Sequence, residues 1–520
     1  MKNRGWKRIL ALIPALAMLF SVSCAYDITA RVAEDGQVET SGTESKEERA
    51  RKKSGQEEAQ TKSEENEDRE EKGKGTAEKP DFEGMTFAEA HDAFQTTLER
   101  EESDDDPIPE PPEGLFDLVY YPSKVGELAA YVSSDPGDDE KHPLIIWVVG
   151  GWGNGIDDFP WIYPEWDDDQ TGSAFWRSGV LTMYPSFRGG NGNPGYYETL
   201  FGEVDDIVSA YEYAASLPYV DPNRIYLGGH STGATRALLA TEYTDKFRAV
   251  FCFGAVDEIK YHNNSQFTFD TNIEDEYTMR SPIHWLEDIK TPTFLIEGRD
   301  GNSENLINID SQTTNENINC YVIEDADHFS VLAPLTRVAA QKILEDTGDT
   351  VNISITQEEL DEAMEQEPES LLPVMEAYVV DGIGLNFDCP YLWSIEDISE
   401  EGEFAYEMTS IYEDDNAWDN AVVYLDAWTS DNEEYFGLMA ESLEEGGYKT
   451  RETTINGLPA LMAVNYVQND EGSSYKNSYV MIQNENIFVA FDFYVHERFE
   501  EEGDVLFEAI ANSIYFEVSE

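Results

Sequence analysis

Cationic side chains are scarce in this chain. Its 520 residues include 34 Lys and Arg but 107 Asp and Glu, so the formal net charge at pH 7 is -73. Because like charges repel over long distances, this charge excludes binding to the phosphates of nucleic acids, and no basic patch interrupts it. We therefore expect no DNA or RNA partner.

Cysteine is also rare, with four residues in the chain. Three of them, Cys252, Cys320 and Cys389, lie outside the N-terminal segment, and this odd number argues against a disulfide framework in an exported protein. Buried free thiols are expected instead. No His and Cys residues have the spacing of zinc ligands, so no structural metal site is predicted. The acidic loops at residues 157–158 and 167–169 are expected to be solvated rather than to hold calcium.

Long apolar runs are nearly absent as well. One run, residues 9–20, follows four basic residues and is too short and wrongly flanked for a stable membrane span. Residues 1–24 are therefore predicted to be a secretory signal peptide. Small residues precede Cys24, which resembles a bacterial lipoprotein cleavage site, although Ser21 replaces the usual leucine. Lipidation of Cys24 would anchor the protein to the outer face of a bacterial cell membrane, and the alternative is a free secreted protein.

The rest of the chain divides by composition. Residues 25–106 are rich in charged and small polar residues and are predicted to be a disordered linker, with a short helix considered around residues 87–94. Residues 107–348 begin with a Pro-rich lead-in and then alternate apolar strand-like runs with amphipathic helices. Such alternation predicts an α/β fold with a doubly wound, mostly parallel sheet. Residues 349–374 read as a helical linker, and residues 375–520 as a smaller α+β domain with an antiparallel sheet.

One stretch of the predicted α/β domain contains a candidate nucleophile. An apolar run at residues 225–227 leads into Gly229-x-Ser231-x-Gly233 and then directly into a helical pattern. A sharp turn between strand and helix, with glycine on both sides, exposes the serine hydroxyl as a nucleophile. The alternative is a small-residue turn that serves packing only.

A serine nucleophile needs a base and an acid that orients the base. His328 follows the last predicted strand and is the expected general base. Asp300, in the turn after the preceding strand, is the expected acid, because the order Ser, Asp, His then matches the order of this fold. Glu304 and Asp257 are the alternatives for the acid.

The tetrahedral oxyanion also needs backbone donors. The amide after the nucleophile belongs to Thr232, and the glycine-rich loop at residues 150–155 offers Gly151 and, next to it, Trp152. Arg188 lies in another glycine-rich loop and either binds a substrate carboxylate or pairs with an internal one. The polar and aromatic insertion at residues 261–285 either covers the mouth of the pocket or is a plain surface excursion.

These motifs together resemble the α/β-hydrolases of the prolyl oligopeptidase and dienelactone hydrolase branch. The resemblance rests on the serine turn at residues 229–233, on residues 187–192, on residues 281–283 and on residues 327–329. It implies a serine hydrolase with neither metal nor organic cofactor. Val149 stands where these enzymes often have histidine, and the acid loop is shorter than their usual Gly-x-x-Asp arrangement. No segment could form their N-terminal propeller, which favours an esterase or a peptidase for small substrates.

The C-terminal domain weakly resembles the PsbP-like domains of exported lipoproteins, which implies binding or docking. No constellation of catalytic residue types lies in it. The sequence thus predicts an exported serine hydrolase that cleaves a small ester or peptide through a Ser231 acyl-enzyme. The alternative is an inactive hydrolase-fold binding protein of the cell surface, and the oligomeric state stays open.

Overall fold

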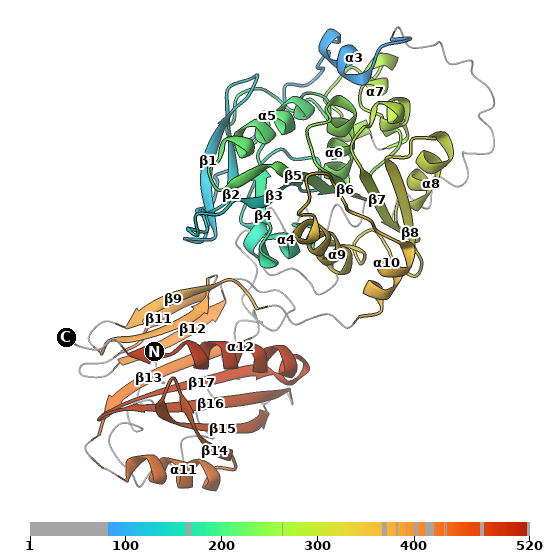
Figure 1. The fold of residues 1–520 in the computed structure, drawn as a ribbon. Helices are drawn as coiled ribbons and strands as arrows, with labels where there is room; N and C mark the ends of the chain where they lie inside the picture. The colour runs from blue at the N-terminus through green and yellow to red at the C-terminus, as the bar shows by residue number, and fades with distance from the viewer. Residues whose placement is uncertain are drawn as a thin grey trace. The chain divides into compact units, whose positions relative to one another are not determined.

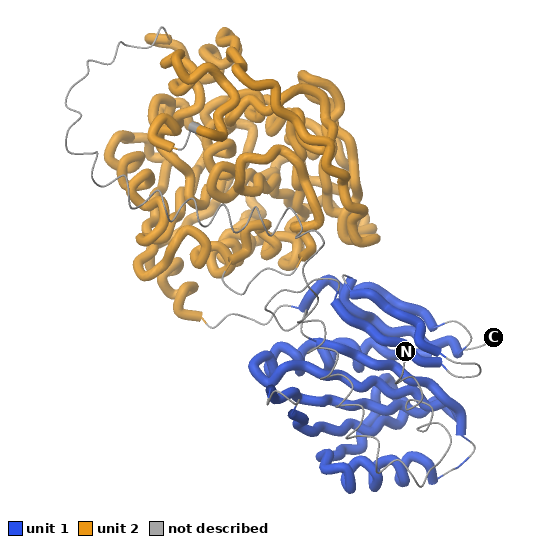
Figure 2. The backbone as a smooth tube through the Cα atoms, turned by 180° about the vertical axis from the view of Figure 1, so that it is seen from behind, with its two compact units in different colours: residues 1–43, 370–520 blue, residues 44–369 orange. Residues whose placement is uncertain are grey.

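The computed structural model describes residues 82–516, except for residues 163–167, 263, 367–371, 381–382, 392, 400–403, 411–420, 431, 433 and 469–472. The signal peptide and the predicted lipidation site at Cys24 lie outside the described residues. The chain forms two compact units, which divide near residue 370. In Figure 2 the first unit along the chain, which ends at residue 369, is orange, and the second, which contains residues 370–520, is blue.

The first unit is built on an eight-stranded sheet with the order β1-β2-β4-β3-β5-β6-β7-β8. Its strands are β1 (Phe116–Pro122), β2 (Glu127–Ser133), β3 (His142–Val148), β4 (Leu181–Pro185), β5 (Val220–His230), β6 (Val250–Phe253), β7 (Thr293–Gly298) and β8 (Ile318–Ile323). The first two strands form an antiparallel hairpin, and β2 runs antiparallel to β4. All the other pairings are parallel. The predicted mostly parallel sheet is therefore confirmed.

Helices cover both faces of this sheet (Figure 1). On one face lie α5 (Gly202–Ser216), α6 (Thr232–Tyr243) and α8 (Ser303–Gln312), whose apolar side chains share one core. On the other lie α4 (Ser173–Arg177), α9 (Leu332–Glu345) and α10 (Gln357–Met364). The strands read as continuous apolar runs because both of their faces are buried. The chain passes from β4 back across β3 to β5, so the switch point of the sheet lies at the carboxyl ends of β3 and β5, where such folds bind ligands.

An N-terminal arm, residues 82–106, packs against this unit. Its helix α3 (Phe87–Ala93) begins with a capping box between Thr86 and Glu89, and both Phe87 and His91 are buried. The considered short helix is thus present, but the expectation of a disordered linker is wrong for residues 82–106. Aromatic side chains hold the arm in place, as in the contact of Phe87 with Trp285 at 5.3 Å between ring centroids. A few large apolar groups suffice to order a stretch whose average composition is highly charged.

The helical stretch of the predicted linker 349–374 is also present, as α10, and it packs on α9 within the first unit. None of the helices in the described part of the chain has the length and hydropathy that a membrane span requires. The three cysteines outside the N-terminal segment are free thiols, with Cys252 and Cys389 buried and Cys320 half-buried.

The second unit contains two antiparallel sheets. The larger has the order β11-β12-β13-β17-β16-β15-β14, and the smaller has the order β18-β10-β9. The strands are β9 (Met375–Val380), β10 (Leu385–Pro390), β11 (Trp393–Asp397), β12 (Phe404–Ser410), β13 (Val422–Thr429), β14 (Lys449–Ile455), β15 (Leu458–Gln468), β16 (Ser474–Asn484), β17 (Ile487–His496) and β18 (Tyr515–Phe516). Helix α11 (Tyr435–Glu445) packs near β14 and β15, while α12 (Glu500–Ser513) contacts β10, β16 and β17. This is the α+β architecture that the sequence predicts.

Candidate active site

The serine turn lies where β5 ends and α6 begins. Ser231 has φ 55° and ψ -122°, a backbone conformation that residues with a side chain rarely adopt. A Cβ atom added to Gly229 would lie 2.6 Å from the Val148 carbonyl oxygen, and one added to Gly233 would lie 2.1 Å from the same atom. Both flanking residues must therefore be glycine, since β3 passes directly against the turn.

A histidine and a glutamate meet beside the serine turn, at the carboxyl ends of the parallel strands. The Nδ1 of His328 lies 2.8 Å from Oε2 of Glu297, whose side chain is fully buried at the end of β7. The other oxygen of Glu297, Oε1, accepts from the backbone N–H of Gly298 at 2.8 Å. Because the carboxylate accepts from Nδ1–H, the basic lone pair of the imidazole is on Nε2. That arrangement is the one a general base requires.

Ser231 and His328 flank a shared segment at the end of β6. The backbone N–H of Ser231 donates to the carbonyl of Phe253 at 2.7 Å. At the next residue, a Cβ added to Gly254 would lie 2.3 Å from Cε1 of His328 and 2.7 Å from Oε2 of Glu297. The carboxyl ends of β5, β6 and β7 and the loop after β8 thus bring the serine turn and the His–Glu pair together.

His230, the residue before Ser231, also connects the serine turn to His328. Its Nε2 donates to the backbone carbonyl of His328 at 3.2 Å, and the two imidazole centroids are 4.5 Å apart. Burial, with a smaller contribution from the charge of His328, holds the pKa of His230 well below its ordinary value. His230 is therefore a neutral side chain that packs against the candidate base.

The predicted oxyanion residues also lie at this edge. Thr232 donates from Oγ1 to the carbonyl of Gly151 at 2.5 Å, and a Cβ on Gly150 would lie 3.2 Å from Cβ of Ser231. Thr232 is the first residue of α6, where a backbone N–H has no acceptor within the helix. Trp152 packs on Phe267 of the insertion, with ring centroids 5.7 Å apart. The structure thus places Gly151 and Thr232 beside Ser231. The side chain of Trp152 contacts Phe267 of the insertion.

The predicted acid, Asp300, is not the residue that hydrogen bonds Nδ1 of His328. Asp300 lies exposed in the turn after β7, and its backbone N–H donates to the carbonyl of Ala326 at 2.9 Å. Of the two alternatives, Glu304 is exposed on α8, and Asp257 accepts from the side chain of Asn308 at 2.5 Å. The carboxylate beside Nδ1 of His328 is instead that of Glu297.

The conformation of the turn after β7 explains why Glu297, and not Asp300, contacts His328. A Cβ on Gly301 would lie 2.2 Å from Oε1 of Glu297, so the short turn wraps around the carboxylate and leaves no room for an acid from the loop. The sequence did contain a signal: Glu297 ends the apolar run of residues 293–296. A carboxylate buried with such a strand needs a hydrogen-bonding partner.

Arg188 does not reach a substrate position either. Its Nε and Nη2 donate to the two oxygens of Asp206, each at 2.9 Å, and its Nη1 donates to Glu198 at 2.7 Å. The side chain is buried among these groups. Of the two interpretations made for Arg188, the internal ion pair is therefore correct and the substrate carboxylate is wrong.

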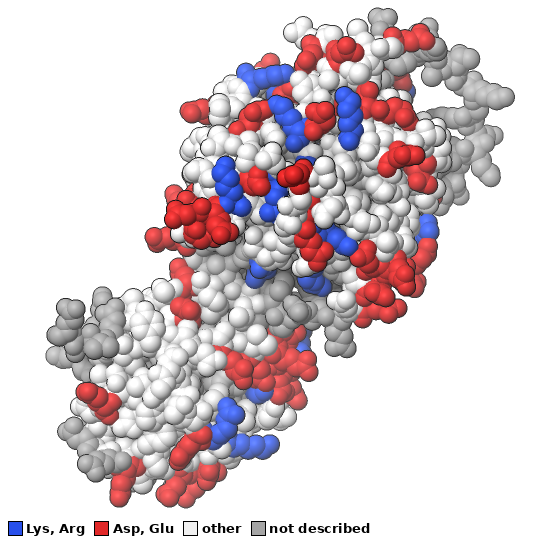
Figure 3. All heavy atoms as spheres, viewed as in Figure 1, with Lys and Arg blue, Asp and Glu red and all other residues white. Residues whose placement is uncertain are grey.

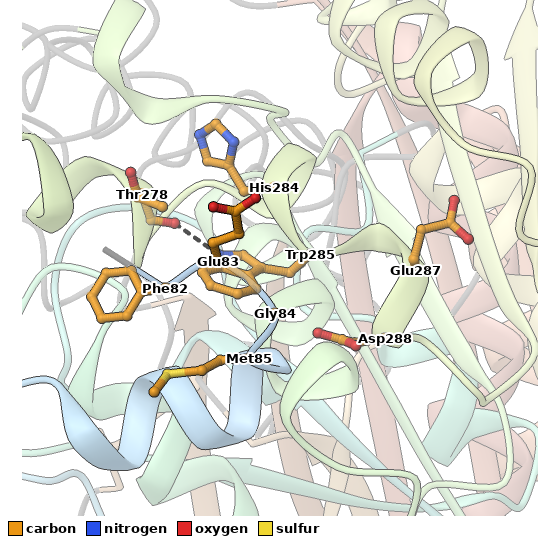
Figure 4. Close-up of a pocket in the computed structure, with 9 residues that line it drawn as sticks. All are labelled: Phe82, Glu83, Gly84, Met85, Thr278, His284, Trp285, Glu287 and Asp288. Atoms are coloured by element: carbon orange, nitrogen blue, oxygen red, sulfur yellow. Dashed lines mark hydrogen bonds between the residues drawn. The ribbon is translucent and has the colours of Figure 1, made fainter. Parts of the chain in front are cut away.

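A cavity of about 370 Å³ lies away from these residues, between the arm and the insertion (Figure 4). It is lined by Phe82, Glu83, Gly84, Met85, Thr278, His284, Trp285, Glu287 and Asp288. The indole N–H of Trp285 donates to the carbonyl of Thr278 at 2.9 Å, which fixes one wall. None of the candidate catalytic residues lines this cavity, so it is separate from the site at the sheet edge.

Comparison with known proteins supports the chemistry of the sheet edge. The sequence model of the prolyl oligopeptidase family matches residues 168–331, the stretch that contains the serine turn, Glu297 and His328. The chain carries a prolyl oligopeptidase family domain. This match supports a serine hydrolase of the peptidase or esterase type. A search of curated proteins finds no significant match.

Several solved structures are similar to part of the chain. A puromycin-hydrolysing peptidase of Mycobacterium tuberculosis is 18% identical with a TM-score of 0.37, over 46% of this chain and 40% of that one. The acylaminoacyl peptidase of Pyrococcus horikoshii is 17% identical with a TM-score of 0.38, over 47% and 44%. The Pyrococcus furiosus esterase Pf2001 is 16% identical with a TM-score of 0.37, over 47% and 97%. This chain thus spans less than half of each of the two peptidases. The family match does not extend to the second unit, whose PsbP-like character stays a prediction.

Proposed function

We propose that the chain hydrolyses an ester or peptide bond through a covalent Ser231 acyl-enzyme, with His328 as general base and Glu297 as the acid that orients it. The hydrogen bond of Glu297 to Nδ1 of His328 carries this proposal, because it leaves Nε2 basic at the carboxyl ends of the strands, where the Ser231 turn also lies. Ser231 Oγ attacks the substrate carbonyl carbon while Nε2 takes its proton.

The later steps use the same groups. The tetrahedral oxyanion accepts from the backbone N–H groups of Thr232 and Gly151, and the protonated His328 gives its proton to the departing alcohol or amine. A water molecule, deprotonated by Nε2, then attacks the acyl carbon. As the bond from the acyl carbon to Ser231 Oγ breaks, the protonated His328 returns the proton to Oγ and the carboxylic acid is released. Glu297 stabilises the imidazolium that forms in both halves of the cycle.

The substrate is proposed to be small. The described residues that precede the sheet form an arm, and the insertion places Phe267 against Trp152 beside the oxyanion loop. We propose that these apolar rings, close to the loop that carries Gly151, favour an acyl chain or an apolar side chain of the substrate. Hydrolysis of short p-nitrophenyl esters and of aminoacyl p-nitroanilides would separate an esterase from a peptidase.

The enzyme proposal is tested with p-nitrophenyl acetate and the variant Ser231→Ala. We expect a burst of nitrophenol that equals the enzyme concentration, followed by slower turnover, and neither phase in the variant. Thermal unfolding of both proteins shows that the variant is folded. A folded wild-type protein that gives no turnover with any of these substrates would instead support the alternative, a hydrolase fold that only binds.

We also propose that the protein is exported and attached to the outer face of the membrane through lipid on Cys24. The sequence of residues 1–24 supports this proposal. Acidic side chains are spread over the faces of both units that Figure 3 shows, and their charge opposes binding to anionic lipid headgroups. Metabolic labelling with an alkyne fatty acid should mark the wild-type protein, and Cys24→Ala should release an unlabelled protein into the medium.

A further inference from the structure

Arg236 is a buried guanidinium on the nucleophile helix that the mechanism above does not use. It lies on α6 with 2% of its surface exposed. Its Nη1 and Nη2 each lie 3.4 Å from the carbonyl oxygen of Gly153, and Nη2 donates to Oδ1 of Asn154 at 3.0 Å. Among the described residues its Nε has no hydrogen-bond partner. The side chain thus connects the nucleophile helix to the oxyanion loop, residues 150–155.

The charge of Arg236 is compensated only through a relay. Asn154 accepts from Arg236 and donates from Nδ2 to Oε1 of Glu203 at 2.9 Å, whereas no carboxylate of the described residues forms a direct ion pair with Arg236. Burial raises the pKa of Glu203, but the charges of Arg236 and Arg188 outweigh it and hold that pKa below its ordinary value. A charge buried without a direct partner is costly, and the fold keeps one here beside the oxyanion loop.

Asn154 in turn fixes the far end of this loop. Its carbonyl accepts from the backbone N–H of Phe187 at 2.8 Å and from Oγ of Ser186 at 3.0 Å. The near end is fixed by the contacts of Gly150 and Gly151 with the serine turn. Arg236 is the group that holds the carbonyl of Gly153, between these two anchored ends.

We propose that Arg236 is a positioning residue for the oxyanion site, which holds the loop so that the N–H of Gly151 faces the substrate oxygen and adds positive potential where negative charge develops. This inference rests on the proposed function. Backbone donors stabilise a transition state in proportion to how well they are aligned before the reaction, and a small displacement costs a large factor in rate. A buried positive charge acts more strongly there than it would in water.

The inference is tested in the full-length protein with Arg236→Met and Arg236→Lys. The control is Arg248→Met, which removes another guanidinium with little exposed surface. Arg248 binds Asp346 and lies just before β6, at the amino ends of the parallel strands and away from the candidate site. Each variant is assayed with p-nitrophenyl acetate for kcat and KM and with an alkyl trifluoromethyl ketone, which forms a hemiketal oxyanion on the serine. Circular dichroism and thermal unfolding establish that each variant is folded.

We expect Arg236→Met to lower kcat by about 30-fold with KM changed less than about threefold, and to weaken the trifluoromethyl ketone by a factor similar to the loss in kcat/KM. Arg236→Lys keeps the positive charge but loses the two parallel N–H groups of the guanidinium, so its decrease in kcat should be intermediate. If Arg236→Met does not fold, the kinetics of Arg236→Lys test the inference. Arg248→Met should lower the unfolding temperature and leave kcat unchanged. Rates within threefold of the wild type, or a lower kcat with unchanged affinity for the ketone, would overturn the inference alone. If Ser231→Ala still turns over, the proposed function fails and the inference falls with it.

Discussion

Both units of the chain hold a carboxylate in a β-sheet, but Glu297 is buried near the end of a strand and Asp492 is half-buried in the middle of one. Glu297 is the penultimate residue of β7, where it accepts from His328 and from the backbone of Gly298. Asp492 lies in the middle of β17, paired across the sheet with Tyr424 and Tyr479, and it accepts from Asn477 at 2.6 Å. Glu297 near its strand end can orient His328, the candidate base, whereas Asp492 accepts from neighbouring side chains of its own sheet. The first unit thus has a candidate catalytic pair at its strand ends, whereas we find no such arrangement among the described residues of the second unit.

The largest loss of activity is expected from substitution of Glu297, near the end of β7. Glu297→Gln removes the charge that stabilises the imidazolium and allows the wrong tautomer of His328, so kcat should fall by about 10³- to 10⁴-fold. Asp300→Asn changes an exposed carboxylate in the same turn and is the matched control, with an expected change below about threefold. Steady-state kinetics on both variants check this prediction. A severe loss in Asp300→Asn and none in Glu297→Gln would restore Asp300 as the acid.

The next effect concerns the glycine that separates Ser231 from His328. Gly254 has φ +74°, and an added Cβ would lie 2.3 Å from Cε1 of His328. Gly254→Ala should therefore displace the imidazole, lower kcat by about 100-fold and reduce the free energy of unfolding by about 1–3 kcal/mol.

The matched substitution in the second unit should have the opposite effect. Gly437 lies on α11 with no atom within 4 Å of an added Cβ. Gly437→Ala should stabilise the protein by about 0.5–1 kcal/mol without any change in kcat. Denaturant unfolding and kinetics measure both variants, and a fully active Gly254→Ala would contradict the described packing of His328.

The last effect is a pH dependence of stability in the second unit, which leaves catalysis untouched. Burial raises the pKa of Asp492 to about 6, although Asn477 and Tyr494 donate to it. An acid whose pKa is raised on folding binds more protons in the native state, so its contribution is fully present below pH 4 and is lost as the pH rises through 6. The loss amounts to about 2 kcal/mol between pH 4 and pH 7.

Asp492→Asn removes this titration while it keeps an acceptor for Asn477. Denaturant unfolding at pH 4.5 and pH 7.5 should therefore show a smaller decrease in stability for the variant than for the wild type. Equal decreases in the two proteins would show that Asp492 titrates normally and that the sheet does not bury its charge.

The parts of this molecule that could be predicted from sequence are those with strong local signals. Fully apolar runs between helical patterns predict the parallel sheet, and the glycines at residues 229 and 233 predict the serine turn because only glycine fits against β3 there. The acid could not be predicted as readily, since two carboxylates three residues apart differ only in which one the turn encloses. The arm was missed because its average composition hides a few aromatic residues whose partners lie far along the chain.

The central claim is that Ser231 is the nucleophile of the first unit, and it is tested most directly by covalent labelling. The full-length protein is treated with a fluorophosphonate, digested and analysed by mass spectrometry. The claim predicts a single modified residue, Ser231, and slower labelling of Glu297→Gln than of Asp300→Asn. Modification of another serine, or no modification of a folded protein, would contradict it.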